Sequence, residues 1–143
     1  MNVLVINCGS SSIKYKFYSM PSEGLISKGS LDKIGEKGSY IANHRQGLEL
    51  ILQKIDSVEA IGHRVVHGAE EFRKPALIDK RVINRLKMCS NLAPLHNPAN
   101  LEGILACGDI LKVLKQVAVF DTAFYQRLPR KDFIYVMPNS FYL

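Results

Sequence analysis

A turn rich in hydrogen-bond donors follows the first apolar stretch of the chain. Residues 3–6 are four apolar residues of high β propensity, and they end at Asn7 and a run of glycine and serine. Glycine lets the backbone bend sharply, and the serines add hydroxyl and backbone N–H groups that can cradle phosphate oxygens. An ordinary polar hairpin explains the same pattern, and the spacing is not that of a Walker A loop. The donor-bearing residues of the turn are Gly9, Ser10, Ser12 and Lys14.

A second stretch, GHRVVHG at residues 62–68, places an arginine inside an otherwise apolar strand. Side chains alternate along a strand, so Arg64 faces away from His63. A buried guanidinium is costly unless an anion meets it, and its planar fork suits a carboxylate or a phosphate. Two interpretations stay open: a bound anionic ligand, and an internal ion pair with a carboxylate such as Glu70 or Glu71.

A third stretch sets a carboxylate directly after an apolar strand. Asp121 and Thr122 follow residues 116–120. A carboxylate at such a position can hold Mg²⁺ directly or through water. A helix or turn cap is the alternative, because Asp and Thr commonly fill that role.

His63 and His67 are four residues apart, but in a predicted strand that spacing sets them about 13 Å apart, too far to share a metal ion. His63 and His67 are therefore interpreted as hydrogen-bonded structural groups. His44 lies in a predicted loop and is assigned no role.

The elements that must position these residues form a mixed α/β pattern. Three meandering strands precede strand–helix units, which predicts a mixed sheet covered by helices. Ligands gather beyond the carboxyl ends of strands in such sheets, so Asn7, His67 and Asp121 are expected at one edge. Helices are predicted over residues 46–55, after a cap at Asp79, and from a cap at Asn97 with a stripe that includes Leu101, Ile104 and Leu105. Strands are predicted over residues 3–6, 14–18, 25–31, 58–66 and 116–120.

Composition is that of one soluble globular domain: 143 residues, 47% apolar and 22% charged. No apolar run reaches the length of a membrane span, and the first residues do not resemble a signal peptide. Three cysteines without metal spacing predict a reduced, cytoplasmic protein. The net charge of +6 suits an anionic substrate, and without interleaved aromatic and basic residues neither nucleic acid nor membrane is an expected partner.

In this order along the chain, NCGSSSIKYKFY, GHRVVHG, LAPLHNPAN and VFDTAF together resemble the acetate and propionate kinase family. The resemblance covers nearly the whole chain. It implies a ribonuclease-H-like domain of the actin-like ATPase superfamily. It also implies phosphoryl transfer between ATP and a short-chain carboxylate, acetate or propionate, with Mg²⁺ as cofactor and acetyl phosphate and ADP as products from acetate.

The resemblance assigns phosphate and metal roles at two of the stretches. Asn7 matches the magnesium-associated residue of the family, and Asp121 matches its active-site aspartate, a second metal-linked group. Gly9, Ser10, Ser12 and Lys14 match the phosphate-facing turn.

Substrate roles are implied for four further residues. Arg64 matches the arginine that meets the carboxyl or acyl-phosphate group, and His96 matches a histidine near the transferring phosphoryl group. Val66 and Leu95 match residues that wall a small acyl pocket. Acetate, with a pKa of about 4, is deprotonated at neutral pH and needs charge neutralisation more than a general base. Asp121, Arg64 and His96 are therefore the expected catalytic residues, and Asp121 is expected to position metal or water more than to accept a proton.

Three departures from the family pattern stand out. Tyr125 replaces a histidine that usually follows DTAF, and Ala69 replaces a glycine that usually follows GHRVVHG. The segment between residues 18 and 58 is also shorter than usual.

Family members are much longer, and a second actin-like domain holds their adenosine-binding elements. Residues 1–143 are therefore expected to form a single amino-terminal domain that is inactive alone, without the nucleotide-binding domain. Its expected partner is a separately encoded carboxy-terminal half or a second copy of itself. The alternative is a non-catalytic remnant or anion-binding module of the same fold.

Overall fold

A mixed sheet of six strands forms the centre of the computed structural model, which describes residues 1–124, 128–129, 138 and 140. The strand order is β3-β2-β1-β4-β6-β5. Strands β1, β4 and β6 run parallel, while β2 and β3 continue β1 as an antiparallel meander and β5 pairs antiparallel with β6. The strands are β1 (Asn2–Gly9), β2 (Ser12–Ser19), β3 (Gly24–Asp32), β4 (Ala60–Val65), β5 (Ala76–Leu77) and β6 (Lys115–Phe120).

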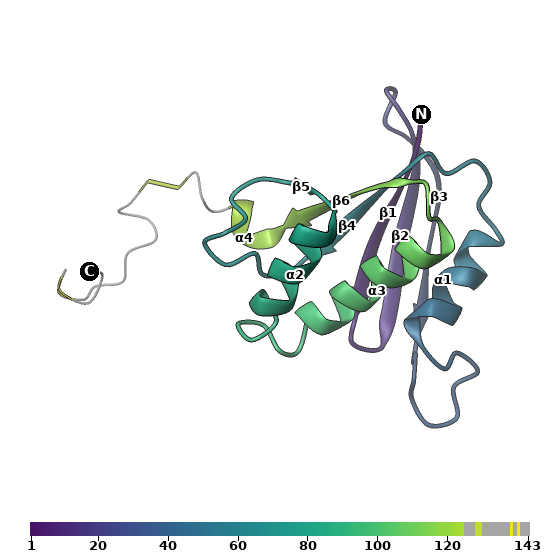
Figure 1. Ribbon diagram of the computed structural model, residues 1–143. Helices are drawn as coiled ribbons and strands as arrows, with labels where there is room; N and C mark the ends of the chain where they lie inside the picture. The colour runs from purple at the N-terminus through teal and green to yellow at the C-terminus, as the bar shows by residue number, and fades with distance from the viewer. Residues whose placement is uncertain (125–127, 130–137, 139, 141–143) are drawn as a thin grey trace.

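Three helices cover one face of the sheet (Figure 1). A short fourth helix continues directly from β6. Among the described residues, no helix combines the length and the apolar character needed to cross a bilayer. The helices are α1 (His44–Leu52), α2 (Lys80–Cys89), α3 (Asn97–Ile110) and α4 (Asp121–Phe124).

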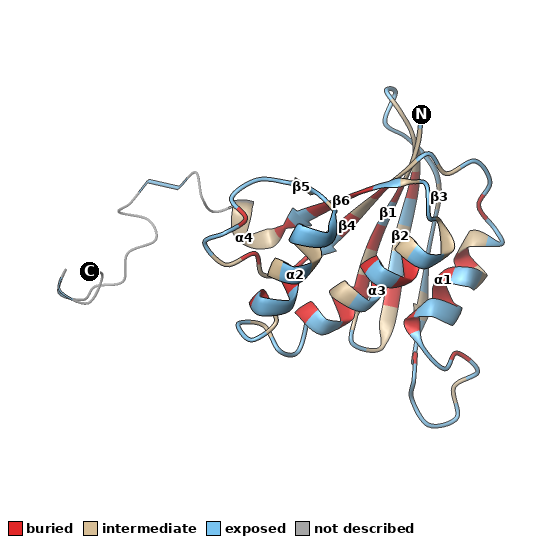
Figure 2. Ribbon diagram, viewed as in Figure 1, coloured by how far each residue is buried: buried red, intermediate tan, exposed pale blue. Residues whose placement is uncertain are grey.

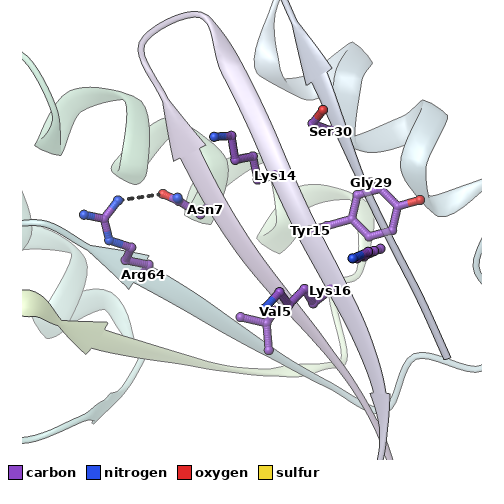
Figure 3. Close-up of a pocket in the computed structure, with 9 residues that line it drawn as sticks. Val5, Asn7, Lys14, Tyr15, Lys16, Gly29, Ser30 and Arg64 are labelled. Atoms are coloured by element: carbon purple, nitrogen blue, oxygen red, sulfur yellow. Dashed lines mark hydrogen bonds between the residues drawn. The ribbon is translucent and has the colours of Figure 1, made fainter. Parts of the chain in front are cut away.

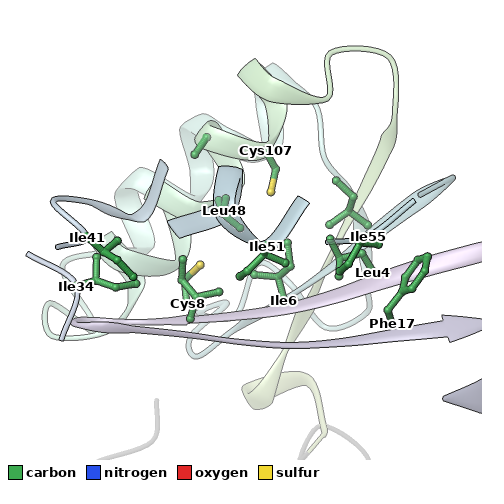
Figure 4. Close-up of a cluster of buried hydrophobic side chains, with 13 residues drawn as sticks. Leu4, Ile6, Cys8, Phe17, Ile34, Ile41, Leu48, Ile51, Ile55 and Cys107 are labelled. Carbon is green, nitrogen blue, oxygen red and sulfur yellow. The ribbon is translucent and has the colours of Figure 1, made fainter. Parts of the chain in front are cut away.

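The core lies between the sheet and α1 and α3. Residues of β1, β2, β4 and β6 that point toward the helices, such as Leu4, Ile6 and Cys8 of β1, are buried, which gives the banded pattern of Figure 2. Burying each large aliphatic side chain contributes about 1.5–3 kcal/mol. The main cluster, drawn in Figure 4, is Leu4, Ile6, Cys8, Ile13, Phe17, Ile34, Ile41, Leu48, Ile51, Ile55, Ile61, Ala106 and Cys107.

Helix α3 packs directly on β1 because Gly103 has no side chain. A Cβ at this position would collide with the Sγ of Cys8. Burial, with smaller effects from Cys107 and Glu102, raises the pKa of the Cys8 thiol to about 12, and burial raises that of Cys107 to about 12. Both thiols therefore stay protonated and serve as packing groups.

Most predicted elements are confirmed, and the ribonuclease-H-like α/β prediction agrees with the observed mixed sheet. Asp79 caps α2, since its Oδ1 accepts the Val82 N–H at 2.7 Å. The prediction for Asn97 is wrong: His96 is at the cap position and Asn97 is the first helical residue. Leu105 is 41% exposed, so it does not belong to the buried stripe of α3.

His63 is buried as a neutral, hydrogen-bonded group, as predicted. It is 3% exposed, and its Nε2 accepts a hydrogen bond from the side-chain amide of Gln116 at 2.7 Å. The same amide donates to the Ile104 carbonyl and accepts from the Gly108 N–H. Burial lowers the pKa of His63 to about 4, because the charged imidazolium would lose its hydration.

Acid should therefore destabilise the fold through His63. The unfolded chain takes up this proton near pH 6.5 and the folded chain only near pH 4, so stability is full above pH 6.5 and falls as the pH drops toward 4. The loss is on the order of 3 kcal/mol. Urea unfolding from pH 7 to pH 4 should show a shallower loss for His63→Asn than for the parent chain. Equal slopes for His63→Asn and the parent chain would contradict the assignment.

Candidate functional site

Two strand residues, Asn7 of β1 and Arg64 of β4, meet Asp121, the first residue after β6, in one hydrogen-bond network at the carboxyl edge of the sheet. Arg64 donates from Nε to Oδ1 of Asp121 at 3.0 Å and from Nη2 to Oδ2 at 2.6 Å. Its Nη1 donates to Oδ1 of Asn7 at 3.2 Å (Figure 3). Asn7 and Asp121 thus lie at one edge, as the order of the strands predicts, and Arg64 joins them where His67 was expected.

Arg64 is not buried, contrary to the sequence-based expectation. Its side chain is 48% exposed and that of Asp121 is 37% exposed. The reason is the strand alternation: His63 and Val65 face the helices, which leaves Arg64 on the sheet face that no described helix covers.

The ion pair exists, but with a different partner from those predicted. Glu71 pairs with Arg85, and Arg64 pairs with Asp121. A guanidinium has five N–H groups, and the contacts to Asp121 and Asn7 use three of them. Two N–H groups of Arg64 therefore remain for a ligand, so the ion pair and anion binding are compatible.

The serine turn between β1 and β2 is tight, and a buried histidine holds its backbone through a hydrogen bond. Gly9 pairs with Ser12, and a Cβ on Gly9 would come within 2.9 Å of the Ser12 Oγ. The Gly9 carbonyl accepts a hydrogen bond from Nε2 of the buried His44 at 2.7 Å. The other ring nitrogen of His44 lies 3.2 Å from a carboxylate oxygen of Glu102. His44 thus ties the turn to α1 and α3.

Lys14 points into the same region as the network. It is the register partner of Asn7 on the neighbouring strand β2, it is exposed, and it lines one cavity together with Asn7 and Arg64 (Figure 3). Ser10 is exposed at the tip of the turn. The site edge therefore carries two cationic side chains, of which only Arg64 has a carboxylate partner among the described contacts.

Two buried asparagines at the start of α3 hold the strand ends. Asn100 accepts the Val66 N–H at 3.0 Å and donates to the Cys8 carbonyl at 2.6 Å. Asn97 accepts the His67 N–H at 3.1 Å and donates to the His67 carbonyl at 2.8 Å. The sequence analysis missed Asn100 and misassigned Asn97. The signal was available, because polar residues three apart on a buried helix face predict hydrogen bonds into the core.

His96 and Leu95 lie just before α3 and outside the network. Leu95 is 76% exposed and His96 is exposed, whereas Val66 is half-buried. Within the described part of the chain, no hydrogen bond joins the His96 side chain to Asn7, Arg64 or Asp121. The structure therefore brings the arginine, asparagine and aspartate together and leaves this histidine and leucine facing solvent.

The oxygen donors at the edge suit Mg²⁺ in type. Asp121 offers a carboxylate and Asn7 an amide oxygen, and Mg²⁺ usually takes one or two carboxylates with water and phosphate oxygens completing the octahedron. No cluster of three metal-binding side chains occurs in the residues that the structure describes. The residues therefore fit a metal shared with a phosphate ligand and do not form a complete protein cage.

The loop after β4 contains a residue in the left-handed backbone region. Ala69 has φ 52°, and its N–H donates to Nδ1 of His67 at 2.9 Å. The preceding Gly68 N–H donates to Oγ1 of Thr122 at 3.0 Å, which links this loop to the start of α4. Ala69 thus holds a conformation that suits the glycine of the family pattern. Tyr125, the other substituted position, lies outside the described residues.

The acetokinase family model matches residues 39–143 of this chain. The acetate kinase of Treponema denticola is 41% identical over 169 residues, which cover 99% of this chain and 43% of that protein. The acetate kinase of Brachyspira hyodysenteriae is 42% identical over 170 residues, with the same shares. Among solved structures, Porphyromonas gingivalis acetate kinase matches with a TM-score of 0.88 and 37% identity over 98% of this chain and 42% of that one. A propionate kinase from Francisella tularensis matches with a TM-score of 0.83 and 36% identity over 96% of this chain and 41% of that one.

This chain belongs to the acetokinase family. Its fold is the ribonuclease-H-like, actin-like fold of the acetate kinases, as the sequence predicted. It spans about two fifths of the length of the relatives it matches. The alignment to the Treponema denticola protein extends over 169 residues against 143 in this chain, so it includes positions that this chain lacks. That these lacking positions fall between residues 18 and 58 stays a prediction.

Replacing Ala69 with glycine should stabilise the protein. A left-handed conformation costs an L-residue about 1–2 kcal/mol, and glycine escapes most of this cost. We expect Ala69→Gly to raise the free energy of unfolding by about 1 kcal/mol in urea titrations. The exposed Ala42, whose φ is not positive, is the control: Ala42→Gly should leave stability unchanged or lower it. A destabilised Ala69→Gly would show that the strain is absent.

Proposed function

We propose that this chain forms the carboxylate- and phosphate-binding part of a kinase that transfers a phosphoryl group between ATP and a short-chain carboxylate, acetate or propionate. The observation that supports this most directly is the Arg64 fork, held by Asp121 and Asn7 at the carboxyl edge of the sheet with two N–H groups left over. In this proposal residues 1–143 are the amino-terminal domain. The adenosine-binding elements belong to the part of the relatives that this chain does not span. The proposal includes a cytoplasmic location.

Phosphoryl transfer to a carboxylate requires mainly that the negative charges of the two reactants be neutralised. A short-chain carboxylate is ionised at neutral pH and already nucleophilic, so the barrier lies in bringing one anion to another. Arg64 binds the carboxylate or acyl phosphate through its free N–H groups and holds it in line. Lys14 and the serine turn of Gly9, Ser10 and Ser12 face the phosphate oxygens. Fixed donors of this kind lower the barrier because they need no reorganisation during transfer.

Asp121 acts as a positioning carboxylate in this proposal. It fixes the plane of the Arg64 guanidinium by its two-point contact, and a base is not needed for an ionised acceptor. Asp121 and Asn7 would also hold Mg²⁺, which when bound supplies neutralisation of phosphate charge. Val66 and Leu95 would wall the acyl group, and His96 would contact the transferring phosphoryl group.

A non-catalytic, anion-binding module of the same fold is the second candidate. The observation that favours it is the exposure of His96 and Leu95, which stand apart from the Arg64 network. Both candidates predict anion binding at Arg64. They differ in whether phosphoryl transfer occurs once the adenosine-binding elements are supplied.

Removing the Arg64 side chain should abolish anion binding at little cost in stability. Exposed ion pairs contribute about 0–1 kcal/mol, and both partners here are more than a third exposed. We expect Arg64→Ala to weaken acetyl phosphate binding at least about tenfold in calorimetric titration, equivalent to about 1.4 kcal/mol, with an almost unchanged thermal melt. Arg45, an exposed arginine paired with Glu49 and Asp109, is the matched control, and Arg45→Ala should bind as the parent does. Equal affinities for parent and Arg64→Ala, or a large drop in melting temperature, would remove the substrate role.

The 143-residue chain by itself should show no kinase activity. The reason is that the proposal assigns the adenosine-binding elements to a part of the relatives outside the matched span. A hydroxamate assay with ATP, Mg²⁺ and acetate measures acetyl phosphate directly. Formation above the blank that disappears in Arg64→Ala would contradict this expectation and would show that the chain is sufficient for transfer.

A further inference from the structure

The serine turn is a two-residue hairpin loop whose backbone conformation is not the one that such loops prefer. Gly9 and Ser12 are register partners, so Ser10 and Ser11 alone form the loop. Two-residue hairpins favour turns with positive φ, because the twist of those turns matches the twist of the paired strands. Neither Ser10 nor Ser11 has a positive φ. The conformation of this turn therefore depends on contacts from outside the hairpin.

Two such contacts hold the carbonyl groups of the turn. The N–H of Ile34 donates to the Ser11 carbonyl at 2.9 Å, and Nε2 of His44 donates to the Gly9 carbonyl at 2.7 Å. The backbone N–H groups of Ser10 and Ser11, in contrast, have no acceptor among the hydrogen bonds of the described residues. The contacts thus fix the turn by its carbonyls and leave its N–H groups for a ligand.

The two ring nitrogens of His44 both face oxygen atoms that can only accept. His44 is the first residue of α1, and its Nδ1 lies 3.2 Å from a carboxylate oxygen of Glu102 on α3, the helix packed beside α1 (Figure 1). Its Nε2 faces the Gly9 carbonyl. A neutral imidazole has one N–H and one lone pair, so it can satisfy only one of these two partners. The two contacts together require both protons, which makes His44 an imidazolium.

Glu102 is the charged partner of this ring. His44 is 4% exposed, and a buried cation is costly without an opposite charge. Burial raises the pKa of Cys8, at the end of β1, to about 12, so this thiol is neutral. The charged side chains of β2, Lys14 and Lys16, lie on the other face of the sheet. The remaining charged side chains of α1, α3 and the loop before α1 are all exposed: Lys33, Glu36, Lys37, Arg45, Glu49 and Asp109.

We propose that His44 positions the serine turn for an anion: as an imidazolium held by Glu102, it fixes the Gly9 carbonyl and places a positive charge behind the N–H groups of Ser10 and Ser11. This inference rests on the proposed function, because the anion is the phosphate group of ATP or of the acyl phosphate. A charge inside the protein acts on a nearby anion more strongly than a charge in water, since the dielectric is lower. His44 acts through the turn and does not touch the ligand.

The protonation of His44 can be measured without any ligand. Nitrogen NMR of the folded chain at about pH 6 should show a proton on each of the two ring nitrogens of His44. His44→Gln identifies the two signals, because both disappear in this variant. A ring with only one protonated nitrogen would overturn the proposal, whether or not an anion binds.

Calorimetric titration with acetyl phosphate tests the positioning. His44→Gln keeps a side-chain donor for the Gly9 carbonyl but removes the charge, and it should raise the Kd at least about threefold. His44→Leu removes the donor as well and should raise the Kd at least about tenfold. Asn43→Ala is the control, because Asn43 accepts the Gln46 N–H at the N-cap of the same helix and does not contact the turn. This variant should lower the melting temperature and keep the parent affinity.

The outcomes separate this inference from the proposed function. Parent affinity in His44→Gln would overturn the positioning role and leave the proposed function standing, and this variant decides the question even if His44→Leu does not fold. An equal loss of affinity in Asn43→Ala would also overturn it, because the loss would then come from damage to α1. Absence of acetyl phosphate binding by the parent chain would remove the proposed function and the positioning role together.

Discussion

The divergence of β1 from β4 at their carboxyl ends is the constraint on which the site depends. The register pairs the two strands only as far as Ile6 and His63, so beyond this point the backbone groups of β1 and β4 that face each other are not paired between the two strands. Asn100 supplies a partner, since its amide joins the Cys8 carbonyl to the Val66 N–H from within the core. A buried backbone group left without a partner would cost about 1–3 kcal/mol, and the asparagine removes that cost while keeping the strands apart. The gap that it holds open is where the side chains of Asn7 and Arg64 meet.

The fold was largely predictable because the signals for it are local. Apolar periodicity located five strands and three helices, whereas β5, with two residues, is too short to produce a pattern. Strand order alone predicts that Asn7 and Asp121 lie at one edge, but it assigns His67 to that edge and not Arg64, which joins them one residue before the end of β4. The contact of His44 with the Gly9 carbonyl spans 35 positions, and nothing in the sequence around His44 indicates it. Long-range hydrogen bonds of this kind depend on how helices dock, which local periodicity does not encode.

The misjudged burial of Arg64 has a different cause. Alternation fixes which residues share a face of a strand but does not say which face a helix covers. Strand β4 has apolar or small residues on both faces, so the sequence fits a fully buried strand, as parallel strands usually are. The helices among the described residues lie on only one side, and Arg64 lies on the other. Val5 and Val119 lie on the same side as Arg64 and are exposed for the same reason.

The sheet face that no described helix covers and the edge site are parts of one surface. Asn7 and Arg64 lie at the carboxyl end of the strands whose middle carries Val5 and Gly62. A ligand bound over this edge would withdraw water from beside the Arg64 and Asp121 pair. Coulombic interactions strengthen as the surrounding dielectric falls, so the guanidinium would be held more rigidly and its free N–H groups would bind an anion more strongly. Asp121 and Asn7 already fix the orientation of the Arg64 guanidinium. Once water is excluded from beside this network, the lower dielectric would let the same fixed N–H groups stabilise a transferring phosphoryl group more strongly.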